Sequence, residues 1–390
     1  MMNHRWAVVH RCSGLVTVIV ALACGDAPPP PQAMVRDSAG IRIVELGPLV
    51  DIDAFRLGEP VYRLGWSDTD HNFSQVVTGV LLSEGRTAVG DWGSDEVVIL
   101  TSAGTVEAVL GGPGQGPEEI GSLQSLSRLP GDTLVLRDLG NGRISFIHEG
   151  QWVRSYRSEV AYLLTAVGLQ DRNLVMVTVG YRPGFDEPWF QGSIVRHPLE
   201  TQQFDTVRSF DWVSRMSRGE TSPLPAWGSV GVTAGALLIT RGDRAQVEVL
   251  DLEGRTTQII RWTERRRTVT DDLWAEYAEH MRSGIAGDDA EVNRFLAEGR
   301  AAADELPYLS YVHGDTEGRV WVSEYSLPSR YPERYRVFDR AGDWLGWVTM
   351  PPRVEILDIG SDMILAIQRN DFDVEAIVLL PLQAGGLALP

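Results

Sequence analysis

The chain has 390 residues, of which 43% are apolar and 23% charged, so it has enough apolar residues for a core and is not typical of a disordered chain. Its formal net charge of −18 should repel nucleic-acid phosphates and anionic lipid headgroups. All 35 basic residues are arginines. Without lysine, the chain can form neither a Walker-type phosphate loop nor a Schiff base.

Residues 1–24 have the three parts of an export signal. Arg5 and Arg11 come first, the apolar run 15–22 follows, and Ala23 and Cys24 end the segment. The run is too short to span a bilayer as a mature helix. The last four residues, ALAC, resemble the lipobox of bacterial lipoproteins, in which the cysteine is acylated and becomes the new N-terminus. We therefore predict a lipid on Cys24, although Ala rather than Leu at the first lipobox position leaves ordinary signal cleavage as an alternative.

The residues that follow should first form a tether and then enter the folded domain. Pro28 to Pro31 favour an extended tether over 25–36, and the domain is expected over 37–390. A short strand is predicted within 37–46. Residues 60–65 have the pattern of an outer strand that has no blade in front of it. Cys24 would be the only thiol of the mature chain, so no disulfide can form within it.

The same unit occurs twice between residues 75 and 156. Gly85 corresponds to Gly131 and Gly104 to Gly150, each pair 46 residues apart. Short runs rich in Val, Ile and Leu lie between these glycines and have the length of strands. A four-stranded unit repeated at this period is typical of the blades of a β-propeller.

Between the two copies stands the glycine-rich GGPGQGPEE, residues 111–119. Backbone amides of such loops can hold anions. Here no lysine assists them, and Glu118 and Glu119 would repel an anion. Pro117 followed by two acids instead suits the first turn of a short helix between blades, so we predict a structural role.

Four further units have the same alternation of short apolar runs and turn residues. They bring the count to six four-stranded antiparallel blades. The third unit has strands expected near 160–168, 173–180, 192–199 and 204–210, and the fourth over 229–233, 236–241, 246–254 and 257–262. The fifth lies within 308–350, and the sixth supplies only 354–359, 363–368 and 374–380. Residues 60–65 should complete the sixth blade and close the ring, because an open sheet edge is unfavourable.

Residues 263–306 interrupt the strand pattern with a predicted helical insertion. Thr270 can cap a helix whose apolar stripe includes Trp274 and Tyr277. Asp288 and Glu291 form a capping box that opens a second helix. The insertion joins blade four to blade five, so it should lie on one face of the disc, either as a lid over the channel or as a structural brace.

Two segments of the sequence resemble the bacterial six-bladed propellers related to NHL-repeat and TolB-like proteins. The first is GRTAVGDWGSDEVVIL with GGPGQGPEEIGSL, and the second comprises the last two blades, including EGRVWVSEY and DFDVEAIVLLPL. The resemblance covers the chain from about residue 40 to the end and implies the six-bladed fold. It does not settle function, since the wider group includes lactonase-like enzymes with a metal in the channel and many non-catalytic binding proteins.

A metal-dependent lactonase would need carboxylates and amides that converge from the inner strands. Only His313, Glu355 and Asp358 could serve, and they lie on two adjacent blades. No histidine pair has ligand spacing, and no nucleophile elbow is present. We therefore predict no catalytic residue, metal or cofactor, and we keep the lactonase-like hydrolase as the alternative.

A binding function is favoured by the loops between the second and third strands of the blades, which share one face. Aromatic residues mixed with arginine suit a recognition surface. The candidate contacts are Trp92, Tyr181, Arg182, Arg241, Tyr325, Arg330, Tyr331 and Arg369. Asp91 and Asp138 occupy equivalent blade positions, and we expect them to hold their own turns by hydrogen bonds.

Together these patterns predict an exported, lipid-anchored propeller that binds a protein or small ligand without chemistry. It would face the periplasm or the cell surface, contact the membrane only through the lipid on Cys24, and be a monomer that binds no nucleic acid.

Overall fold

The computed structural model describes residues 33–66, 71–158, 163–170, 173–179, 189–198, 204–214, 224–233, 235–284 and 289–385. The predicted export signal with Cys24 and the tether residues up to 32 lie outside these ranges, as do Tyr181, Arg182 and Asp288.

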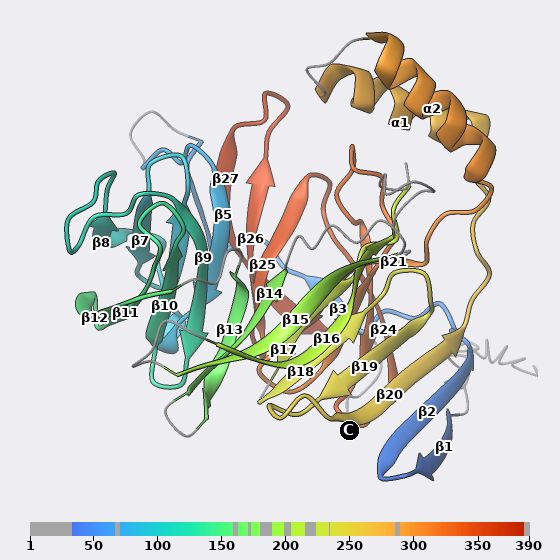
Figure 1. Cartoon of the computed structure of the whole chain (residues 1–390), viewed down its shortest axis with the longest axis horizontal. Helices are drawn as coiled ribbons and strands as arrows, with labels where there is room; N and C mark the ends of the chain where they lie inside the picture. The colour runs from blue at the N-terminus through green and yellow to red at the C-terminus, as the bar shows by residue number, and fades with distance from the viewer. Residues whose placement is uncertain are drawn as a thin grey trace, which may run out of the picture.

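Six sheets, whose blade strands are antiparallel, are arranged in a ring, so the predicted six-bladed β-propeller is confirmed (Figure 1). Blade one has β5 (Val76–Leu81), β6 (Thr87–Asp91), β7 (Glu96–Leu100) and β8 (Val106–Gly111), with a 3₁₀ turn at Ser83–Gly85. Blade two has β9 (Leu123–Leu129), β10 (Thr133–Asp138), β11 (Arg143–His148) and β12 (Gln151–Arg157). Blade three has β13 (Leu163–Gln170), β14 (Asn173–Val179), β15 (Trp189–Pro198) and β16 (Asp205–Ser214).

The other three blades follow the same order from the channel outward. Blade four has β17 (Ser229–Thr233), β18 (Ala236–Thr240), β19 (Gln246–Leu250) and β20 (Thr256–Thr263). Blade five has β21 (Leu309–Gly314), β22 (Val320–Glu324), β23 (Arg334–Phe338) and β24 (Trp344–Thr349). Blade six has β25 (Val354–Ile359), β26 (Met363–Arg369) and β27 (Glu375–Ala384) from the C-terminal part of the chain.

The ring is held together by apolar clusters between the blades. Within the described residues, each of the six seams between neighbouring blades contains one such cluster. The middle strands pack against both neighbours and are almost wholly buried; every residue of β6 is buried, for example. Outer strands such as β8 alternate between exposed and half-buried positions. This is why the middle strands are continuous apolar runs in the sequence.

An N-terminal strand closes the ring, as predicted. β4 (Tyr62–Leu64) pairs antiparallel with β27 and becomes the fourth strand of blade six. Tyr62 is buried in the seam with blade one, where its hydroxyl lies 2.9 Å from Oγ1 of Thr87. A second short strand, β3 (Phe55–Leu57), pairs with the end of β27.

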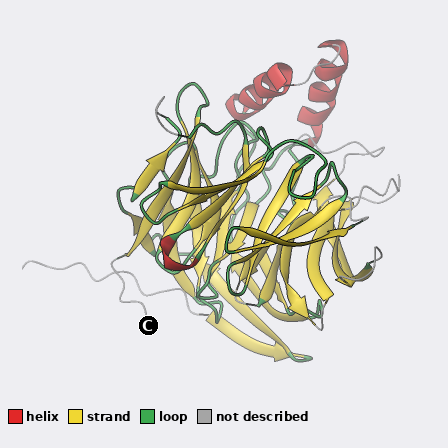
Figure 2. Ribbon diagram, turned by 90° about the vertical axis from the view of Figure 1, so that its left-hand side faces the viewer, coloured by secondary structure: helices red, strands yellow, loops and turns green. Residues whose placement is uncertain are grey.

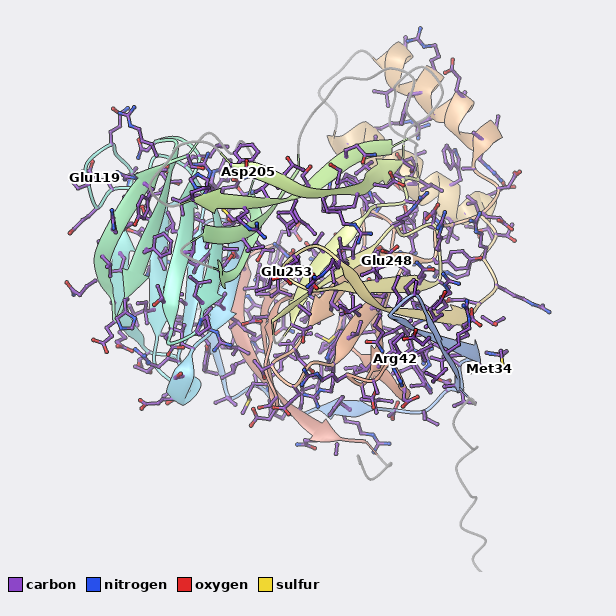
Figure 3. The ribbon with its side chains drawn as sticks, turned by 60° about the horizontal axis from the view of Figure 1, so that its bottom comes forward. Met34, Arg42, Glu119, Asp205, Glu248 and Glu253 are labelled. Atoms are coloured by element: carbon purple, nitrogen blue, oxygen red, sulfur yellow. The ribbon has the colours of Figure 1, made fainter. Side chains whose placement is uncertain are left out.

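The first two strands of the chain pair with blade four, which the sequence did not predict. β1 (Ala33–Ser38) and β2 (Ile41–Pro48) form a hairpin, and β2 runs parallel to β20 at the outer edge of blade four. In Figure 1 the blue hairpin lies beside the yellow β20, and Figure 3 labels Met34 and Arg42 on it. β1 begins at Ala33, so the sheet includes the last four residues of the stretch expected as tether.

The chain then crosses blade five before it reaches blade six. Ala54 donates a backbone hydrogen bond to the carbonyl of Trp347, and Trp347 donates one to the carbonyl of Ile52. The N-terminal segment 33–64 therefore follows the outer edges of blades four, five and six in turn.

The glycine-rich segment 111–119 is a loop, so the short helix predicted there is wrong. Glycines disfavour a helix by about 1 kcal/mol each, and the loop has partners of its own. Gly116 donates its amide to Oε2 of Glu119 at 2.7 Å. A carboxylate of the loop itself therefore occupies the place that a bound anion would take, and the structural role is retained.

The helical insertion consists of α1 (Asp271–Gly284) and α2 (Asp289–Ala302), on one side of the strands (Figure 2). Thr270 accepts a hydrogen bond from the amide of Leu273 at 3.3 Å, as expected of a cap. Buried apolar residues of both helices, including Tyr277 and Leu296, pack with Tyr325 and Leu327 of blade five. Within the described residues, no helix is long and apolar enough to cross a membrane.

Candidate functional site

A cavity of about 990 Å³ opens on the face that carries the loops between the second and third strands. Its floor is formed by the inner strands β17, β21 and β25. The loops β22–β23 and β26–β27 form one wall, Trp212 and Trp227 another, and His280 of α1 contributes from the helical insertion. The helical insertion thus packs on blade five as a brace, and one of its residues, His280, lines the cavity.

Four of the predicted contact residues come together at this cavity. Tyr325, Arg330, Tyr331 and Arg369 all line it, although Tyr325 is only 4% exposed and packs mainly against the helices. The other two described candidates lie elsewhere and are not among the lining residues of this cavity.

Those two candidates have neighbours of their own. Trp92 on blade one is 46% exposed and donates its indole N–H to Oγ of Ser122 at 3.1 Å. Arg241 on blade four forms ion pairs with Asp211 at 2.6 Å and Asp243 at 3.0 Å.

Arg369 is the charged centre of the cavity. It donates to Oε2 of Glu355 at 2.9 Å and to Oε1 of Glu375 at 2.7 Å, and its guanidinium lies 5.1 Å from the ring centre of Tyr331. Glu375 also accepts the amide of Val76 from blade one at 2.7 Å. These contacts hold the guanidinium in place, because charge-assisted hydrogen bonds reach it from carboxylates on two strands, β25 and β27.

Three tyrosines surround this ion pair. Burial raises the pKa of Tyr311, Tyr331 and Tyr335, and the negative charge of Glu355 raises it further in each case. All three phenols are therefore neutral at pH 7. Tyr335 is 2% exposed, whereas Tyr311 is 51% exposed because its ring faces into the cavity.

His313 lies between the cavity described above, which we call the upper cavity, and a second one, which we call the lower cavity. The lower cavity, of about 580 Å³, is lined by the inner strands of all six blades and so occupies the central channel. His313 lines both cavities. Burial lowers its pKa to about 4, so the imidazole is neutral at pH 7. Its ring centre is 5.9 Å from that of Tyr335 and 6.5 Å from that of Tyr311.

The residues of the lactonase-like alternative do not converge on one point. Asp358 lines the lower cavity, where it accepts the amides of Leu81 at 2.8 Å and Ile359 at 2.9 Å. Glu355 lines the upper cavity and pairs with Arg369. In the described part of the chain, no three His, Cys, Asp or Glu side chains are grouped as metal ligands. His313, Glu355 and Asp358 therefore do not fit a channel metal.

Asp91 and Asp138 accept hydrogen bonds from the turns that follow them, as expected, and also from the segment that precedes the first strand of their blade. Asp91 accepts the amides of Ser74, Gln75 and Gly93. Asp138 accepts those of Gly121, Ser122 and Asn141. Both carboxylates are fully buried, and each fixes the segment that leads into the first strand of its blade.

The sequence reasoning missed four residues that shape the cavity, namely Trp212, Trp227, Tyr311 and Tyr335. One signal was present. Tyr311 and His313 alternate on the inner strand β21, and alternate residues of a strand share a face. Polar aromatic residues at this spacing on an inner strand indicate a wall that faces the channel.

Comparison with known proteins gives the fold a wider context. No family model matches the chain, and no curated protein matches it. Among solved structures, a protein from Bacteroides fragilis that is named as exported has 12% identity and a TM-score of 0.51, covering 88% of this chain and 99% of its own. A member of the DUF4221 family from Bacteroides vulgatus has 8% identity and a TM-score of 0.53, with coverages of 85% and 98%.

These neighbours share the fold. At such low identity they show the fold alone, and for the fold the resemblance to bacterial six-bladed propellers is confirmed.

Proposed function

We propose that this chain is an exported propeller that binds a small ligand, or a short segment of a partner protein, in the upper cavity. The observation that supports this most directly is the cavity itself. It is large, it lies on the expected face, and it gathers aromatic rings around a fixed ion pair. Concave sites of this kind, of roughly 300–1,000 Å³ with a few placed polar groups, are typical of ligand binding.

Binding without catalysis is supported by the engagement of the carboxylates that could transfer protons. Asp358, which lines the lower cavity with His313, has its oxygens bonded to backbone amides. Glu355, which lines the upper cavity with His313, is paired with Arg369. Both carboxylates are thus engaged by other groups, whereas a general acid–base pair requires two groups that can exchange protons with one substrate.

Export and lipid attachment are supported by the lipobox-like sequence that ends at Cys24. The B. fragilis neighbour is named as an exported protein, which agrees with export. Replacing Cys24 with Ala should abolish labelling by a palmitate analogue and release the protein from the membrane fraction. If neither the wild type nor the variant is labelled, the protein carries no lipid anchor.

The binding proposal is tested by thermal shift of the full-length protein in detergent against a library of small molecules and short peptides. We expect at least one compound to raise the melting temperature of the wild type, and the shift to be lost in Tyr311→Ala, whose half-exposed side chain contributes little to folding. A library without any such compound would overturn the proposal. Hydrolysis of lactones that depends on added Ca²⁺ would favour the lactonase-like enzyme instead.

A further inference from the structure

The upper cavity presents polar groups that have no protein partner. Among the described residues, the hydroxyls of Tyr311 and Tyr335 and the ring nitrogens of His313 have no hydrogen-bond partner. Tyr335 is more than nine-tenths buried and still lines the cavity. A ligand that covers these groups must offer hydrogen bonds in return, because a buried polar group without a partner is costly.

These three groups all have the same hydrogen-bonding character. A neutral phenol and a neutral imidazole can each donate one hydrogen bond and accept another. The phenol does both through one oxygen, whereas the imidazole donates from one ring nitrogen and accepts at the other. A hydroxyl group can act as donor or acceptor toward any of these atoms, so a ligand rich in hydroxyls suits all three groups.

Each arginine that lines the cavity already has a carboxylate partner. Arg369 pairs with Glu355, Arg353 with Asp373 at 3.0 Å, and Arg330 with Glu276 at 2.5 Å. Glu333, whose side chain is exposed, is a further carboxylate of the lining. An anionic ligand would have to displace one of the paired carboxylates and would be repelled by Glu333, whereas an uncharged ligand can enter while all three pairs remain in place.

Aromatic faces are the third feature of the cavity. Tyr311 is 51% and Trp227 43% exposed, and both line the cavity. The face of an aromatic ring is electron-rich and attracts C–H groups that carry partial positive charge. A sugar ring has such a C–H face and carries hydroxyls around its edge.

We propose that the upper cavity binds an uncharged oligosaccharide, with sugar faces on Trp227 and Tyr311 and hydroxyls bonded to Tyr311, Tyr335 and His313. This inference rests on the proposed binding function and names the ligand class. The volume of about 990 Å³ is at the upper end of small-ligand sites, which suits several linked sugars better than one.

The test is a glycan array that contains uncharged oligosaccharides and their anionic counterparts, such as cellobiose beside a form in which the C6 hydroxyl is oxidised to a carboxylate. Full-length protein in detergent is applied to the array, and calorimetry then gives the affinity for each hit. We expect uncharged glycans to bind in preference to anionic ones. Tyr311→Phe should weaken binding about three- to tenfold through the lost hydroxyl, and Trp227→Ala at least tenfold.

Trp92→Ala is the matched control, since Trp92 is a similarly exposed tryptophan that does not line the cavity; its affinity should stay within twofold of wild type. The inference is overturned if no uncharged glycan binds, or if neither Tyr311→Phe nor Trp227→Ala weakens binding. If a peptide or another non-carbohydrate binds the wild type but not Trp227→Ala, the proposed binding function stands and the assignment of a sugar ligand is refuted. Absence of any cavity ligand would reject both.

Discussion

Closure of the ring by β4 can be tested by removing the side chains that seat this strand. Tyr62 and Leu64 are both 8% exposed and belong to the apolar cluster between blades six and one. Tyr62 packs directly on Gly104, where an added Cβ would meet the tyrosine ring at 2.3 Å. The double variant Tyr62→Ala with Leu64→Ala therefore removes the side chains that β4 contributes to this cluster.

The expected loss follows from the two truncations. Replacing a buried aromatic residue by Ala costs about 3–5 kcal/mol and a buried Leu about 2–5 kcal/mol. The hydrogen bond between Tyr62 and Thr87 is lost as well, which adds about 1 kcal/mol. The sum, roughly 6–11 kcal/mol, approaches or exceeds the total stability of an ordinary protein, about 5–15 kcal/mol. We expect the double variant to be largely unfolded at 37 °C.

The assay is urea denaturation followed by tryptophan fluorescence, with each single variant measured beside the double one. Val61→Ala is the matched control, because Val61 adjoins the same strand and is 49% exposed; its free energy of unfolding should change by no more than about 0.5 kcal/mol. If Tyr62→Ala unfolds at the same urea concentration as the wild type, β4 does not close the ring and this reasoning is refuted.

Three further predictions concern other parts of the structure. Burial raises the pKa of Asp358 from 3.8 to about 6, so its contribution to stability is present below pH 3.8 and lost as the pH rises through 6. Asp358→Asn should thus gain stability relative to wild type between pH 4 and 7 in urea titrations, and a pH-independent difference would contradict this. Burial lowers the pKa of His313 from 6.5 to about 4, so its contribution is present above pH 6.5 and lost as the pH falls through 4. His313→Gln should become relatively more stable over that fall, and an unchanged difference would argue against a neutral buried imidazole. In the helical insertion, Leu327→Ala should cost about 2–5 kcal/mol and speed proteolysis of the helices. Arg330→Ala breaks only an exposed ion pair with Glu276, so it should cost less than about 1 kcal/mol; equal proteolysis rates for the two variants would show that the ion pair holds the helices.

The blades could be predicted from the sequence because the information for each blade is local. Turn glycines such as Gly104 and Gly150 have positive φ in the structure, at 78° and 71°, and the strands between them are short apolar runs. The β1–β2 hairpin could not be placed in the same way. Its partner β20 lies more than 200 residues further along the chain, and no local pattern specifies a parallel pairing over that distance.

The cavity was harder to predict than the blades. Arg330 and Tyr331 in the β22–β23 loop and Arg369 at the end of β26 were found because aromatic residues and arginine stand out at the ends of strands and in the loops between them. The inner-strand residue Tyr311 and the connecting-segment residue Trp227 were missed, because only the assembled ring brings blades four, five and six around one space. Which face of an inner strand meets solvent depends on the width of the channel. That width is set by the assembled ring and cannot be derived from local patterns in the sequence.

The pairing of β4 with β27 also determines the order in which this protein can be made. β4 ends at Leu64 and is among the first strands to be synthesised, whereas its partner begins at Glu375. Until the last strand has been made, the early strand has no partner, and the contact between them is slow to form because of its sequence separation. The ring can therefore close only after the whole polypeptide has been made, and a chain that is still incomplete keeps the edge of its sixth blade unpaired.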